Sequence, residues 1–140
     1  MISKIEEYAK INNVPIMLPD GIDYLCNYIK ENKIKSILEI GTAIGYSAIR
    51  MALVDKDIQV VTIERDKERY DIAVNNIHEF GLDNRIKQVF GDAMEVEVDG
   101  KYDLIFIDAS KGGSIAFFEK FKKNLSDNGV IVTDNYLFMV

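Results

Sequence analysis

The chain has only one cysteine, Cys26, among its 140 residues. A single cysteine excludes an internal disulfide and a cysteine-based metal cluster, and it fits a protein of the reducing cytoplasm. Long hydrophobic runs are also missing, because stretches such as 104–107 and 130–132 are far too short to cross a bilayer. The N-terminus is charged from Lys4 onward and has no apolar signal-peptide segment. We therefore expect a cytoplasmic protein without a membrane partner.

Basic residues are outnumbered by acidic ones, 17 Lys and Arg against 23 Asp and Glu, which gives a net charge of −6. This balance argues against non-specific binding of nucleic acids, which needs clustered Lys and Arg. A local basic patch could still bind a structured RNA. The shares of hydrophobic residues (48%) and charged residues (29%) are those of an ordinary globular protein. No tandem repeat or low-complexity linker interrupts the chain, so we expect one domain.

Helical and strand patterns alternate along the chain. Two amphipathic helices are predicted in the N-terminal 34 residues, one with Ile2 and Ile5 on its apolar face and one with Ile22 and Ile29. Further on, strands are predicted at 36–40, 58–63, 85–90, 102–107 and 129–133, and helices at 46–54, 66–80 and 114–125. This alternation, with strands that are apolar on both faces, predicts an α/β fold built on a doubly wound parallel sheet.

Polar residues gather where the predicted strands end, which is where ligands of such sheets bind. The first strand leads into Glu39-Ile-Gly41-Thr-Ala-Ile-Gly45-Tyr-Ser47, a turn whose glycines let the backbone approach a ligand closely. Glu64 ends the second strand, at a separation suited to the two hydroxyls of a ribose. Gly91-Asp92-Ala93 follows the third strand with a carboxylate that could accept from an adenine amino group. These signals predict an adenosine-containing cofactor, with Arg65 close enough to frame its mouth.

The spacing of the glycines separates two classes of cofactor. An NAD site favours G-x-G-x-x-G, whose close glycines hold a pyrophosphate at a helix N-terminus. Here the spacing is Gly41-x-x-x-Gly45, with Ala43 where the second close glycine would fall. This favours a cofactor without a pyrophosphate. A nucleotide-dependent oxidoreductase and a purely structural turn are the alternatives.

Asp108 follows the fourth predicted strand, and Asp134-Asn135 follow the fifth. Parallel neighbours lie about 4.8 Å apart, so if these strands are adjacent, two carboxylates and an amide converge. Three hard oxygen ligands suit Mg²⁺ better than zinc. Lys111 lies at the mouth of the same site, where a cation would disfavour its ammonium form and make it a candidate general base. The alternative is that the aspartates only terminate strands and that Lys111 is solvated.

Taken together, these segments resemble the metal-dependent O-methyltransferases of the catechol and caffeoyl-CoA type. The resemblance runs from about Val14 to Leu137 and rests on Leu38-Glu-Ile-Gly41-Thr-Ala-Ile-Gly45-Tyr-Ser47, Val61-Thr-Ile-Glu64, Tyr102-Asp-Leu-Ile-Phe-Ile-Asp108-Ala-Ser-Lys111 and Val132-Thr-Asp134-Asn135. It implies a single domain over residues 1–140, with N-terminal helices in 1–34 and a Rossmann-like methyltransferase core in 35–140.

The resemblance also implies a cofactor, a metal and a base. S-adenosylmethionine (SAM) would be held by Met17, Glu39, Gly41, Thr42, Gly45, Tyr46, Ser47, Glu64, Arg65, Gly91, Asp92, Ala93 and Asp108. Mg²⁺ (or Mn²⁺) would be held by Asp108, Asp134 and Asn135, and Lys111 would be the catalytic base.

Within this family, the segments 8–9, 14–17 and 40–46 look most like the bacterial tRNA 5-hydroxyuridine methyltransferases. That similarity implies methylation of the 5-hydroxyl of a wobble uridine, which could chelate the metal together with its neighbouring carbonyl oxygen, as a catechol does. The implied partner is then tRNA. A small phenolic substrate is the alternative.

The sequence departs from the family pattern at its end. Members normally continue for several dozen residues past the Asp-Asn pair and add a helix and two more strands. We therefore expect a C-terminally truncated, mostly parallel sheet that lacks the last two strands. The bare edge of the fifth strand would then favour a homo-oligomer. A non-catalytic SAM-binding fragment is the alternative from another functional class.

Overall fold

The computed structural model describes residues 2–14, 16–17, 19–108, 114–133 and 137–139. Its elements, in chain order, are α1 (Ile2–Ile11), α2 (Pro19–Glu31), β1 (Ser36–Ile40), α3 (Tyr46–Ala52), β2 (Gln59–Glu64), α4 (Lys67–Glu79), β3 (Ile86–Phe90), β4 (Tyr102–Ile107), α5 (Ser114–Phe121), a 3₁₀ turn η2 (Lys122–Asn124), β5 (Leu125–Thr133) and β6 (Leu137–Met139). Within this described part, no helix is both long enough and apolar enough to span a membrane.

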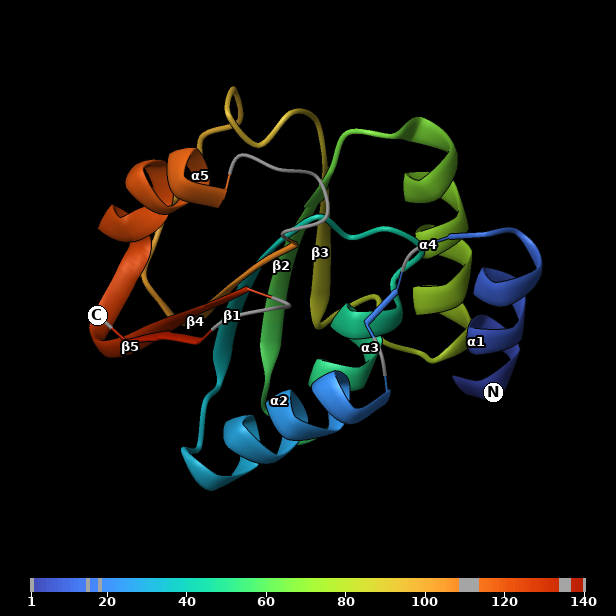
Figure 1. Cartoon of the computed structure of the whole chain (residues 1–140), viewed down its shortest axis with the longest axis horizontal. Coiled ribbons are helices and arrows are strands. Elements are labelled where there is room, and N and C mark those ends of the chain that lie inside the picture. Colours follow the sequence, from blue (N-terminus) through green and yellow to red (C-terminus); the bar gives the residue numbers. More distant parts are fainter. Residues whose placement is uncertain (1, 15, 18, 109–113, 134–136, 140) are drawn as a thin grey trace.

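One six-stranded sheet forms the centre of the molecule, in the order β3-β2-β1-β4-β5-β6 (Figure 1). The first five strands are parallel, and β6 runs antiparallel to β5. The chain moves outward from β1 to β3 and then returns to place β4 on the other side of β1. This order confirms the predicted doubly wound α/β fold, and it puts the topological switch point at the carboxyl ends of β1 and β4.

The two faces of the sheet are covered unequally. Alternate residues of each strand point to opposite faces, so Ile37 of β1 packs with α1 to α4 while Leu38 packs with α5. Besides α5, the second face is covered by residues 91–101, the connection between β3 and β4, which contains no helix. The strands are therefore buried on both sides, as their apolar sequences require, but one side depends on a single helix and an irregular loop.

The helix predicted over 114–125 is shorter than expected, because α5 ends at Phe121 and Leu125 already belongs to β5. The buried Asn124 lies at this junction. Its side-chain amide donates to the backbone carbonyls of Val98 and Gly100, each at 2.9 Å. These bonds satisfy two carbonyls of the 91–101 loop and fix the point at which the chain leaves α5 and enters β5. The periodicity of apolar residues does not reveal such a contact.

The edge of β5 differs from the prediction. We expected the fifth strand to have a bare edge, but Val130, Ile131 and Val132 pair with the antiparallel strand β6. Pairing satisfies backbone groups that an edge strand would otherwise present to solvent or to another chain. The argument for a homo-oligomer through that edge therefore does not hold, and the oligomeric state stays a prediction.

Candidate functional site

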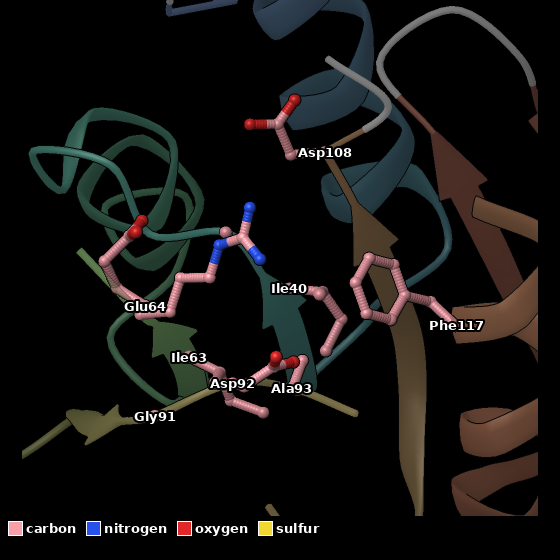
Figure 2. Close-up of a pocket in the computed structure, with 10 residues that line it drawn as sticks. Ile40, Ile63, Glu64, Gly91, Asp92, Ala93, Asp108 and Phe117 are labelled. Atoms are coloured by element: carbon pink, nitrogen blue, oxygen red, sulfur yellow. The ribbon is translucent and has the colours of Figure 1, made fainter. Parts of the chain in front are cut away.

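A cleft of about 460 Å³ lies at the carboxyl ends of β1 to β4 (Figure 2). The cleft is lined by Ile40, Gly41, Ile63, Glu64, Arg65, Gly91, Asp92, Ala93, Asp108 and Phe117. Seven predicted site residues are thus brought together, namely Gly41, Glu64, Arg65, Gly91, Asp92, Ala93 and Asp108.

Backbone hydrogen bonds continue past the strand ends and join the walls of the cleft. The N–H of Gly41 donates to the carbonyl of Ile63 at 2.9 Å, and the N–H of Gly91 donates to the carbonyl of Glu64 at 3.0 Å. On the other side, the N–H of Asp108 donates to the carbonyl of Ile40 at 3.0 Å. The walls of the cleft are therefore held in place by a continuation of the hydrogen bonding of the sheet.

Gly41 is the point of closest approach between the first turn and β4. Its φ of +99° lies in the left-handed region, and a Cβ at this position would lie 2.9 Å from the Cβ of Asp108. Both features favour glycine, because a side chain would be strained and would push into the cleft.

We expect Gly41→Ala to lower the free energy of unfolding by more than Gly100→Ala does. Gly100 has a similar φ of +92° but open space around its Cβ position, so alanine there carries only the backbone cost. The contact with Asp108 should add roughly 1–3 kcal/mol, as overpacking does in cores. Urea unfolding of both variants measures the difference. Equal losses in the two variants would contradict the close approach.

Glu64 lines the cleft and also accepts a hydrogen bond from the backbone of the glycine turn. Its side chain is buried, and its Oε1 accepts from the N–H of Ala43 at 2.7 Å. Its Oε2 accepts from the N–H of Asp66 at 3.0 Å. Ala43 is one of four non-glycine residues in the described chain that have a positive φ, which is 49° here. The sequence assigned Glu64 to a ligand, and the structure adds a second task, which is to stabilise this turn.

A buried polar cluster lies under the same turn. Glu39 and Thr62 are paired neighbours on β1 and β2, and the Thr62 hydroxyl donates to Oε1 of Glu39 at 2.6 Å. Ser47 donates to the other carboxylate oxygen, and the Thr42 and Thr62 hydroxyls are hydrogen-bonded at 2.6 Å. Glu39, Thr42 and Ser47 were predicted to contact the cofactor, but the structure places them beneath the turn and not in the lining of the cleft. Their contact with a cofactor stays a prediction.

The carboxyl group of Glu39 is completely buried. This burial raises its pKa from 4.5 to about 7, against the opposing effect of the hydrogen bonds from Ser47 and Thr62. The negative charges of Asp108 and Glu64 contribute to the same rise. The carboxyl group that supports the glycine turn therefore titrates near neutral pH.

Three other predicted cofactor residues lie apart from the cleft lining. Gly45, with a φ of +92°, faces Ala73 of α4. The buried Tyr46 donates its hydroxyl to Glu6 of α1 at 2.6 Å. Met17 lines a second cavity, together with Tyr46 and residues of α1. These positions tie the N-terminal segment to the start of α3, and a direct role in cofactor binding stays a prediction for all three.

The predicted metal site is only partly within the described residues. Asp108 is half-buried and lines the cleft at the end of β4. The strands β4 and β5 are parallel neighbours, with Ile107 opposite Thr133, so the adjacency on which the prediction depended is confirmed. Asp134, Asn135 and Lys111 lie outside the described residues. The metal and the base therefore stay predictions.

An apolar wall of the cleft was not singled out from the sequence. It is formed by Ile40, Ile63 and the half-buried Phe117 of α5. Figure 2 shows Phe117 across the cleft from Glu64, with Asp92 and Ala93 below. No periodicity signal could identify Phe117, because α5 packs onto strand ends that are distant in sequence.

A doubly wound sheet with an acidic, glycine-lined cleft at its switch point is typical of domains that bind adenosine-containing cofactors. Residues 4–140 match the model of the O-methyltransferase family, and the chain belongs to that family. It is 30% identical over 133 residues to a catechol O-methyltransferase from Mycobacterium tuberculosis, over 92% of this chain and 60% of the relative. The resemblance found in the sequence is thus confirmed at the level of the family.

Two solved structures share the fold closely. One is a provisionally assigned caffeoyl-CoA O-methyltransferase from Staphylococcus aureus, with a TM-score of 0.90 and 40% identity over 96% of this chain and 66% of that one. The other is an O-methyltransferase from Bacillus cereus in complex with S-adenosylhomocysteine (SAH). It has a TM-score of 0.83 and 30% identity, over 94% of this chain and 64% of that one. The chain therefore spans somewhat less than two thirds of the length of these relatives.

Proposed function

We propose that this chain forms the S-adenosylmethionine-binding part of an O-methyltransferase. The observation that carries the proposal is the convergence of Gly41, Glu64 and Asp92, from three different strand ends, on one cleft. Glu64 would accept from the ribose hydroxyls, and Asp92 from the adenine amino group. Each carboxylate oxygen can accept two hydrogen bonds, so Glu64 can bind a ribose while it still holds the glycine turn. The Bacillus cereus relative, solved with SAH, supports this cofactor.

The charge of the cleft favours SAM over a dinucleotide. Among the described residues, three carboxylates, those of Glu64, Asp92 and Asp108, line the cleft with one guanidinium, that of Arg65. A negative cleft attracts the sulfonium and amino groups of SAM and repels a pyrophosphate. In addition, the N–H of Ala43 donates to Glu64, so it is engaged by a carboxylate at the place where an NAD site would present an N–H to a phosphate.

For the methyl transfer we propose that Asp108, Asp134 and Asn135 hold Mg²⁺ or Mn²⁺. Their carboxylate and amide oxygens fit such an ion, which would acidify and orient the acceptor hydroxyl. Lys111 would take the proton of that hydroxyl. The acceptor oxygen would then form a bond to the methyl carbon while the carbon–sulfur bond breaks, and SAH would leave with the electron pair on sulfur.

The acceptor that we favour is the 5-hydroxyl of 5-hydroxyuridine at the wobble position of tRNA. This choice rests on the similarity of segments 8–9, 14–17 and 40–46 to the tRNA-modifying members of the family. A small catechol or phenol is the second candidate and fits equally well, because it offers the same pair of neighbouring oxygens. The Mycobacterium tuberculosis relative is named for catechol.

We expect SAH to bind this chain at least tenfold more tightly than NAD in calorimetric titrations, because the cleft disfavours a pyrophosphate. Transfer of labelled methyl groups from SAM to hypomodified tRNA or to catechol should then stop with EDTA and in Lys111→Ala. NAD binding as tight as that of SAH would contradict the cofactor assignment. Turnover that persists with EDTA and in Lys111→Ala would contradict the metal and the base.

A further inference from the structure

The wall of the cleft that contains Asp92 and Ala93 belongs to a loop without regular secondary structure. Residues 91–101 connect β3 to β4 and begin with a turn. In this turn the carbonyl of Asp92 accepts from the N–H groups of Glu95 and Val96, each at 2.9 Å. The Asp92 carboxylate accepts from the N–H of Met94 at 2.9 Å. These bonds give the turn its shape, but they do not attach it to the rest of the protein.

Lys120 of α5 attaches this turn to α5, in addition to the hydrogen bond from the N–H of Gly91 to the carbonyl of Glu64 and the packing of Ala93 in the core. Its ammonium group donates to the carbonyl of Ala93 at 2.6 Å and to the carbonyl of Val96 at 2.5 Å. It also lies 5.1 Å from the centre of the Phe121 ring. A partly buried ammonium that is satisfied by two backbone carbonyls fixes the position of both, because hydrogen bonds from a charged donor are stronger than neutral ones.

The same side of α5 contributes to the cleft and to the loop. Phe117, three residues before Lys120, lines the cleft opposite Glu64. Asn124, four residues after Lys120, holds the carbonyls of Val98 and Gly100. Positions three apart lie on one side of a helix, so Phe117 and Lys120 share one side of α5, and Asn124 follows in the 3₁₀ turn η2. Phe117 thus faces the cleft, while Lys120 and Asn124 hold the loop that forms the adjoining wall.

We propose that Lys120 is a positioning residue, which places the Asp92–Ala93 turn so that the cleft discriminates adenine from other purines. The proposal rests on the proposed function, since it takes the ligand to be an adenosine-containing cofactor. Asp92 is the group that would read the adenine amino group, and the backbone of this turn is held to α5 by Lys120. A shift of the turn would move the carboxylate away from the amino group while the ribose stays with Glu64.

The chain contains a matched control for Lys120. Lys123 approaches the side chain of Glu97 in the same loop at 3.4 Å, but both side chains are mostly exposed. An exposed ion pair of this kind contributes little to stability. Both lysines can be replaced by methionine, which keeps the length and packing of the side chain and removes the donor.

The test compares SAH with its inosine analogue, in which an oxygen replaces the adenine amino group. We expect wild type to prefer SAH roughly tenfold or more, the value of one hydrogen bond to a charged acceptor. Lys120→Met should lose most of this preference, Lys120→Arg should restore part of it, and Lys123→Met should keep it. Hydrogen exchange at the amides of 94–98 should become faster in Lys120→Met and stay unchanged in Lys123→Met.

Two results would overturn the proposal. The first is an unchanged preference for SAH in Lys120→Met, even if its affinity for both ligands falls. The second is unchanged exchange at 94–98, which shows that Lys120 does not hold the turn. If wild type binds neither SAH nor its analogue, the proposed function fails, and the role of Lys120 in selectivity fails with it. Exchange then still decides whether Lys120 holds the turn.

Discussion

Glu64→Ala is expected to weaken the binding of SAH by roughly two orders of magnitude, with a smaller loss in Glu64→Gln. The carboxylate would accept from two ribose hydroxyls, and hydrogen bonds to a charged group contribute about 1.5–3 kcal/mol each. Alanine also removes the acceptors for the N–H groups of Ala43 and Asp66, so the glycine turn loses its support. Glutamine keeps one acceptor oxygen and should retain part of the affinity.

Calorimetric titration of SAH measures these losses. The exposed Glu68, at the start of α4, provides the control, since Glu68→Ala removes a carboxylate close in sequence that does not line the cleft. Binding of SAH by Glu64→Ala with wild-type affinity would show that the ribose is not held by this residue. An equal loss in Glu68→Ala would show that the effect arises from net charge alone.

The free energy of unfolding of wild type should fall as the pH rises because of Glu39, and Glu39→Gln should abolish this fall. Below pH 4.5 this carboxyl is protonated in both the folded and the unfolded chain. Between pH 4.5 and about 7 the unfolded chain releases the proton while the buried Glu39 keeps it, so the free energy of unfolding falls. Above about pH 7 both states are ionised, and the loss reaches a plateau of about 3 kcal/mol.

Glutamine is uncharged at every pH and fits the same pocket. Its oxygen can accept from Thr62, and its amide can donate to the Ser47 hydroxyl, which replaces the two hydrogen bonds of the carboxyl group. Urea unfolding at pH 5, 6, 7 and 8 should show the variant gaining on wild type as the pH rises. The exposed Glu68→Gln serves as the control for the loss of one acidic group. Parallel pH profiles for Glu39→Gln and wild type would contradict the raised pKa.

The sequence located the cleft because of a simple geometric rule. All parallel strands of one sheet end at the same edge, so residues that directly follow strands are brought together whatever the details of packing. Gly41, Glu64, Asp92 and Asp108 each occupy such a position, and the structure places all four around one cleft. The adjacency of β4 and β5, which the sequence left as a condition, and the order of the strands were supplied by the structure.

Some residues of the 39–47 motif do not line the cleft, although the sequence predicted that they contact the cofactor. Glu39 belongs to the same motif as Gly41, yet its side chain points to the face covered by α3, where Thr62 and Ser47 meet it. Tyr46 follows the glycine turn, yet its hydroxyl reaches Glu6 of α1. A motif shows that residues are near a turn, but the direction of each side chain depends on the face of the strand or helix that carries it.

By itself, the amino-acid sequence determined the α/β alternation, the doubly wound sheet and the residues at its carboxyl edge, because these follow from the periodicity of apolar residues and from chain direction. Only the tertiary structure decided that β6 pairs with β5, that Phe117 lines the cleft and that Lys120 holds the Asp92–Ala93 turn. Each of these contacts joins segments that are not neighbours in the strand–helix pattern, and their partners are chosen by the packing of side chains across elements.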